Sequence, residues 1–76
     1  TYGDLLRILL KNMSLDSKLA EDLITRTRKT IHEDEMAIKA LKIMKENNIT
    51  QVLVTDSGQR YVGIIHLHDL VREGII

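Results

Sequence analysis

The sequence predicts an α+β fold in which a unit ordered strand, helix, strand, strand, helix follows two short helices. One long stretch has the apolar spacing of an amphipathic helix, and two neighbouring stretches rich in Val, Ile and Leu are separated by turn formers. The 76 residues are enough for one domain, which at this size buries only about 60% of the surface of its unfolded chain. We therefore expect the unit to pack as a pair or dimer.

Two short helices are expected ahead of the first strand. Residues 4–10 carry several leucines that fall on one side of a helix, and the turn and cap formers that follow predict a connector at residues 13–17. A second helix is expected at residues 18–24. Its cap is expected to be Asp16 or Ser17, and its inner face Leu19 and Leu23.

The next segments predict a brief strand followed by the longest helix. Polar and β-branched residues lead into a strand around Thr30 and Ile31. Residues 34–47 are then expected to form a helix, which begins at acidic residues that suit its dipole and ends in a left-handed turn at Asn47 or Asn48. Apolar side chains at the i, i+3, i+4, i+7 spacing predict its buried stripe: Ala37, Ala40, Leu41 and Met44.

The C-terminal third predicts a β-hairpin that runs into a final helix. Strands are expected at residues 51–55 and 60–66, joined by a turn at residues 56–58. Because residues 62–65 are continuously apolar, both faces of the second strand should be covered. The last helix is expected at residues 67–72, with Gly74 as its end signal and an inner face of Leu67, Leu70 and Val71. Apolar surface left over at Leu5, Leu9, Ile75 and Ile76 predicts a helical contact with another repeat.

The beginning of the chain repeats its last strand-to-helix junction. Residues 1–7 and 66–72 carry Asp, Leu and Arg in the same register, at an offset of 65 positions (66 minus 1). We therefore predict that residues 1–12 are the tail of a preceding repeat, that residues 13–17 are the connector and that residues 18–76 form the domain.

Composition excludes several classes of function. Eleven basic and eleven acidic residues give zero formal net charge, and Tyr2 and Tyr61 are the only aromatic residues, so a nucleic-acid partner is not expected. No apolar run approaches the roughly 20 residues that span a bilayer, and no leader precedes the domain, so no membrane association is expected. With no cysteine either, we expect a cytoplasmic protein.

The junction at the end of the second hairpin strand resembles the signature of the CBS (cystathionine β-synthase) domain. That family carries glycine, two apolar residues, Ser or Thr, two further residues and Asp, which Gly63, His66 and Asp69 match except for His in the Ser/Thr position. The order of elements also resembles this family over nearly the whole chain. With its histidine, the junction is similar to the second CBS repeat of arabinose-5-phosphate isomerases of the KpsF/GutQ type, which make a precursor of bacterial lipopolysaccharide or capsule.

This resemblance implies a regulatory domain that senses a nucleotide or nucleotide sugar and performs no catalysis. Asp69 would accept hydrogen bonds from ribose, and His66 would face phosphate, making binding dependent on pH because imidazole changes charge near neutrality. The implied partner is a second CBS repeat or a second copy. The ligand-binding residues carried over are Thr30, Ile31, Ile49, Thr50, Gly63, Ile64, Ile65, His66 and Asp69, with Thr1 and Asp4 serving the upstream repeat.

Other interpretations of the same residues remain open. Asp69 could cap the last helix, Gly63 could relieve the packing of a helix on its strand, and His66 and His68 could be surface residues. The whole unit could serve as an oligomerisation module without a ligand. A divalent-metal site at His66, His68 and Asp69 is a further alternative, although a firm site needs three or four protein ligands. No required cofactor and no nucleophile beside a base are indicated.

Overall fold

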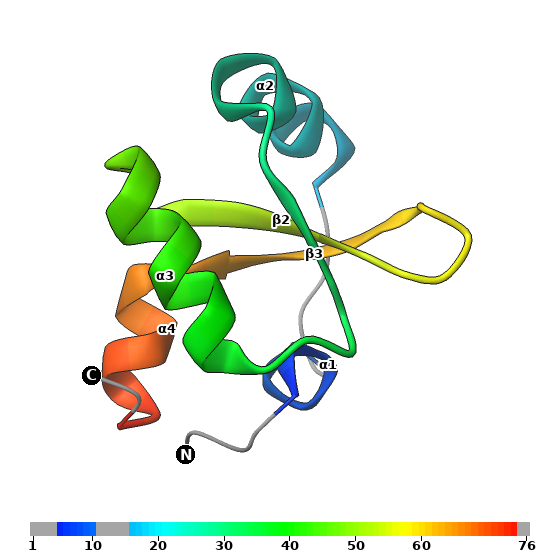
Figure 1. The fold of residues 1–76 in the computed structure, drawn as a ribbon. Coiled ribbons are helices and arrows are strands. Elements are labelled where there is room, and N and C mark those ends of the chain that lie inside the picture. The colour runs from blue at the N-terminus through cyan, green and yellow to red at the C-terminus, as the bar shows by residue number, and fades with distance from the viewer. Residues whose placement is uncertain (1–4, 11–15, 75–76) are drawn as a thin grey trace.

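A computed structural model describes residues 5–10 and 16–74, and its fold is the predicted α+β arrangement (Figure 1). Thr1, Asp4, residues 13–15 of the predicted connector and the last two isoleucines lie outside the described residues. The last two connector residues are described: Asp16 caps the second helix, and Ser17 begins it. The elements follow one another in the expected order. They are α1 (Leu6–Leu9), α2 (Ser17–Thr27), β1 (Thr30–His32), α3 (Ala37–Asn47), β2 (Gln51–Thr55), β3 (Tyr61–His66) and α4 (Leu67–Arg72).

The three strands form one sheet in the order β1-β2-β3. β1 runs parallel to β2, and β2 pairs with β3 in the predicted antiparallel hairpin. Leu53 lies opposite Ile64 and Gln51 lies opposite His66, so the start of β2 is next to the end of β3. This register determines which residues of β2 and β3 lie next to the start of α4.

Helices cover both faces of the sheet, as the continuous apolar character of β3 predicted (Figure 1). On one face, α2 places Ala20 and Leu23 against Leu53 and Ile64. On the other face, α1, α3 and α4 surround Val52, Val54 and Ile65, which are each 0% exposed. Alternate residues of each strand point to opposite faces, so each helical layer receives its own set of apolar side chains.

Helix α3 has the predicted buried stripe but begins at Ala37, three residues later than expected. The acidic residues before it form a turn in which the Glu33 N–H donates to the Thr55 carbonyl (2.8 Å) and the Glu35 N–H donates to the His32 carbonyl (3.0 Å). These bonds fix the backbone in a non-helical shape. At the other end Asn48 takes the left-handed conformation, with φ of 54°.

Helix α2 is longer than predicted, because it continues through residues 25–27, which were expected to lead into the first strand. The Asp16 carboxylate caps it by accepting from the Lys18 and Leu19 N–H groups, as one of the two expected caps. The predicted inner face was half wrong. Leu23 is buried, but Leu19 is 40% exposed, because the helical period puts Ala20 rather than Leu19 beside Leu23 on the sheet.

Helix α1 is shorter than predicted, and it belongs to the core of this domain through Leu6 and Leu10. Leu9 is half-buried against the same core. In α4, Leu70 is fully buried and Leu67 packs at the edge of the core, but the expected inward position of Val71 was wrong, since it is 52% exposed. Val71 follows Leu70 by one position, which rotates its side chain about 100° away from the sheet.

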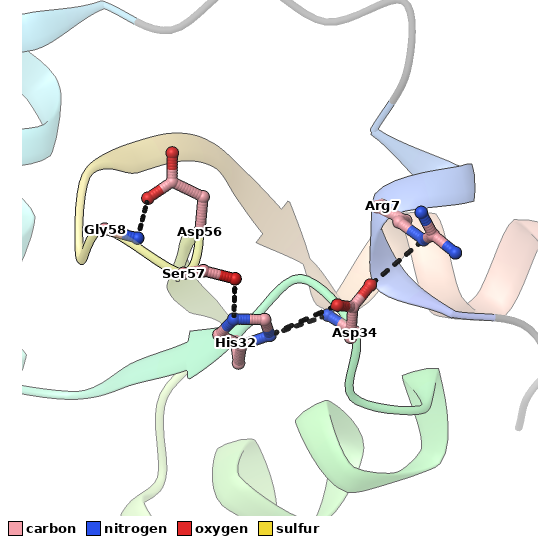
Figure 2. A network of polar contacts seen from close by, with 6 residues as sticks. All are labelled: Arg7, His32, Asp34, Asp56, Ser57 and Gly58. Carbon is pink, nitrogen blue, oxygen red and sulfur yellow. Dashed lines mark hydrogen bonds and ion pairs between the residues drawn. The ribbon is translucent and has the colours of Figure 1, made fainter.

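The hairpin turn is built around Asp56 (Figure 2). Its carboxylate Oδ1 accepts the N–H groups of Gly58 (2.8 Å) and Arg60 (3.0 Å). The residue that takes the left-handed conformation in this turn is Gln59, with φ of 60°. The Arg60 N–H lowers the pKa of the Asp56 carboxyl below its ordinary value, and the Gly58 N–H and the charges of Arg60 and His32 act in the same direction.

Replacing Asp56 by asparagine should destabilise the domain at neutral pH but not in acid. A carboxyl whose pKa is lowered by folding contributes stability above its unfolded pKa of about 3.9, and the contribution is lost as pH falls through the folded-state value. The urea midpoints of wild type and Asp56→Asn should therefore differ near neutrality and converge below about pH 4. A difference that stayed constant down to acid pH would contradict this account of the turn.

Candidate ligand-binding site

Two of the predicted site residues, Thr50 and His66, meet where β2 begins, β3 ends and α4 starts. The Leu67 N–H donates to the Thr50 carbonyl (2.8 Å), which ties the first residue of α4 to the entry of β2. A surface depression of about 380 Å³ lies at this junction. It is lined by Thr50, His66, Leu67, His68 and Val71.

A second depression, of about 200 Å³, continues from Thr50 toward the C-terminal end of α2. Its lining combines two carboxamides, two hydroxyls, a guanidinium and two apolar side chains: Leu23, Arg26, Thr27, Asn48, Ile49, Thr50 and Gln51. Because Thr50 lines both depressions, we call them together the Thr50 groove. The groove brings Ile49, Thr50 and His66 together, three of the residues that the sequence indicated.

Both carboxylate oxygens of Asp69 make contacts within the domain. One carboxylate oxygen accepts the His66 N–H (3.0 Å), and the other pairs with Arg72 Nη2 (2.7 Å), while the side chain is only 15% exposed. Asp69 therefore caps α4, in agreement with the structural interpretation of this residue. Its contact with ribose remains a prediction.

Other predicted site residues lie inside the domain or elsewhere on its surface. Ile64 and Ile65 point to opposite faces of the sheet as core residues, and Ile31 is buried in β1. Gly63 is buried beneath α1: a Cβ built on it would lie 3.2 Å from Leu10 Cδ1, so packing gives this glycine a structural reason.

Thr30 does not join the Thr50 groove. It lines a larger hollow of about 670 Å³ at the hairpin end of the sheet, together with His32, Thr55, Asp56, Ser57, Gln59 and Tyr61. Size alone would favour that hollow. We place the candidate site in the smaller Thr50 groove because the residues of the strand-to-helix junction gather there.

Sequence reasoning missed the α2 side of the groove. Arg26 comes from the end of α2, where its Nη2 pairs with Asp22 Oδ2 (2.9 Å), and Asn48 and Gln51 flank the entry of β2. Asn48 and Gln51 are next to the predicted Ile49 and Thr50 in the sequence, so they could have been predicted as site residues. Arg26 could not have been predicted, because its position depends on how α2 packs on the sheet.

The groove offers hydrogen-bonding groups in a setting that is mostly uncharged. Its hydroxyl, carboxamide and imidazole groups can donate to and accept from the base, sugar and phosphate of a nucleotide. Among residues 5–10 and 16–74, no group of three or more His, Cys, Asp and Glu side chains could hold a metal ion. In the same part of the chain, no helix has the length and apolar character needed to cross a membrane.

Comparison with known proteins adds a family and a set of relatives. The family model for the CBS domain matches residues 20–75. Over 76 residues the chain is 36% identical to the arabinose 5-phosphate isomerase KdsD of Pseudomonas aeruginosa and 32% identical to that of Escherichia coli K12, covering all of this chain and 23% of each relative. It is also 35% identical over 69 residues, 91% of this chain, to the arabinose 5-phosphate isomerase KpsF of Escherichia coli, of which it covers 21%. The chain thus spans less than a quarter of the length of these relatives.

Proposed function

Because the chain belongs to the CBS domain family, we propose that it is a regulatory domain that binds a nucleotide or nucleotide sugar in the Thr50 groove. The observation that carries this proposal is that Thr50 and His66 line one surface depression beside the start of α4, while Ile49 lines the second depression that Thr50 also borders. In this role the domain performs no chemistry of its own.

The protein that contains this domain is proposed to interconvert arabinose 5-phosphate and ribulose 5-phosphate, in the synthesis of lipopolysaccharide or capsule precursors. The names and similarity of the relatives support this reaction. The nucleotide would then report on a later stage of the same synthesis. We place the protein in the cytoplasm, where its phosphorylated substrates are held.

The Thr50 groove is shallow, so we propose that a second CBS repeat or a second copy of the chain closes it. Val71 lines the groove and is 52% exposed, which leaves apolar surface available for such a partner. A closed site would exclude water from the hydrogen bonds to the ligand and strengthen them.

Replacing Thr50 by glutamate should weaken the binding of a nucleotide by about tenfold or more, because two like charges about 4 Å apart near a surface repel by about 1–4 kcal/mol. Isothermal titration calorimetry with mono-, di- and triphosphate nucleotides and with nucleotide sugars would measure this change. Gln59→Glu is the matched control, since it adds the same charge to the hollow at the hairpin end.

The same titration separates the proposal from its main alternative, an oligomerisation module without a ligand. A nucleotide that binds only the folded domain must raise its thermal stability. Equal weakening by Thr50→Glu and Gln59→Glu would place the ligand outside the Thr50 groove. If none of the nucleotides changes the stability of the wild-type protein, the oligomerisation module becomes the better description, and exposed apolar residues such as Ile8 and Met36 its candidate contacts.

A further inference from the structure

A chain of polar contacts far from the Thr50 groove connects α1 to the hairpin (Figure 2). His32, the last residue of β1, is at its centre. Its Nδ1 accepts the Asp34 N–H at 3.0 Å, and its Nε2 lies 3.5 Å from the Ser57 Oγ in the hairpin turn. His32 thus bridges the turn that precedes α3 and the turn that joins β2 to β3.

The turn at residues 33–35, which His32 supports, holds the start of α1. The first N–H groups of a helix have no partner within it and need acceptors from elsewhere. In this domain the Leu6 N–H donates to the Glu35 carbonyl (3.0 Å) and the Arg7 N–H donates to the Glu33 carbonyl (2.9 Å). Arg7 Nε also pairs with Asp34 Oδ1 at 3.0 Å. Any change in the shape of residues 33–35 therefore acts directly on α1.

The bond from Asp34 to His32 needs an unprotonated Nδ1. This geometry assigns the neutral ring with its proton on Nε2, where it can be donated to the Ser57 hydroxyl. A second proton would place an N–H at Nδ1 opposite the Asp34 N–H, and two donors cannot bond to each other. Asp34 Oδ2, which is 3.9 Å from Nδ1, would become the natural acceptor for the charged ring.

We infer that His32 is a pH-sensitive latch for α1. In its neutral form it keeps residues 33–35 in the shape that holds Leu6 and Arg7. In its protonated form it draws the Asp34 carboxylate away from Arg7 and opens the backbone contacts of α1. Histidine is the side chain whose charge ordinarily changes between about pH 5 and pH 8, and this is the range in which the latch is tested.

The charged groups around His32 come from three elements. Asp34 faces the ring from the turn before α3, and Arg7 of α1 pairs with the carboxylate of Asp34. Asp56 and its partner Arg60 lie in the hairpin, and the phenol of Tyr61 lines the same hollow as the imidazole. Because all of these groups belong to one polar network, protonation of His32 should redirect contacts within it without unfolding the domain.

Amide hydrogen exchange measured by NMR on the whole chain tests the latch. After correction for intrinsic exchange rates, protection of the Leu6 and Arg7 amides should be about fivefold lower at pH 5 than at pH 8, the effect of losing one exposed hydrogen bond. The decrease should follow the titration of the His32 ring, recorded in the same samples. Unchanged protection of both amides while His32 titrates would overturn the inference.

His32→Asn provides a variant that keeps the acceptor but cannot be charged. The asparagine Oδ1 can occupy the place of Nδ1 and accept the Asp34 N–H in a local turn, so α1 should stay protected at both pH values. His68→Asn, which removes an exposed histidine outside the network, should retain the pH dependence of the wild type. Persistent pH dependence in His32→Asn would also overturn the inference, and the wild-type titration decides it even if this variant does not fold.

Discussion

Replacing Leu53 by alanine is expected to lower the free energy of unfolding by about 2–5 kcal/mol. Leu53 lies in the central strand, is 0% exposed, and contacts the cluster that holds α2 on the sheet. Small domains are often stable by only about 5 kcal/mol, so a loss at the upper end of this range would leave about half of the variant unfolded at room temperature. Urea unfolding followed by circular dichroism measures the loss.

The matched control for this prediction is Leu19→Ala. Leu19 is on α2 but is 40% exposed, and the same truncation there should cost well under about 1 kcal/mol. If both variants lost similar amounts of stability, then α2 would not pack on the sheet through Ala20 and Leu23 as described. The comparison therefore tests the layer that also positions one side of the Thr50 groove.

Replacing Gly63 by valine should destabilise the domain by about 1–3 kcal/mol, the usual cost of overpacking a core. A Cβ at this position would be 3.2 Å from Leu10 Cδ1 and 3.4 Å from Leu10 Cδ2, and valine adds two methyl groups beyond it. Since Leu10 is itself only 6% exposed, it has little room to move without displacing α1. Chemical denaturation gives the cost, and NMR shifts of the α1 amides report the displacement.

A second substitution tests whether Leu10 is the cause. Leu10→Ala removes the atoms that valine would meet, so Gly63→Val should cost less in a chain that already carries it. Contacting residues typically show interaction energies of about 0.5–3 kcal/mol in such a double-mutant cycle. Strict additivity would mean that Gly63 is needed for another reason, of which close approach by a ligand or a neighbouring chain is the one that the sequence suggested.

Much of this fold could be predicted because its signals are local. The stripe at Ala37, Ala40, Leu41 and Met44 and the hairpin both follow from the spacing of apolar residues, and α4 lies where it was expected. The start of α3 could not be predicted, because hydrogen bonds to Thr55 and His32 override the helical tendency of residues 33–35. In α2, Thr25 and Thr27 continue the helix with hydroxyls bonded to the carbonyls of Glu21 and Leu23, where polar and β-branched residues were expected to lead into a strand.

In the candidate site, too, the features set by local sequence signals could be predicted, and those set by tertiary contacts could not. Thr50 and His66 meet because the hairpin register places Gln51 opposite His66, and that register follows from two recognisable strands. The family signature also marked Asp69, whose type and position indicated the cap that the structure contains. The separation of Thr30 from the groove could not be read from the sequence, because it depends on which part of β2 the short strand β1 pairs with.

The burial of Leu6 and Leu10 has a consequence for where this folding unit begins. The family match starts at residue 20, yet both leucines belong to the buried core, and Leu10 lies against Gly63 of β3. A polypeptide trimmed to the matched region would uncover an apolar sheet surface that water or another molecule must then occupy. The region matched by the family and the region needed for the core therefore begin at different residues. For preparing soluble protein, the start should be chosen from the packing of the core.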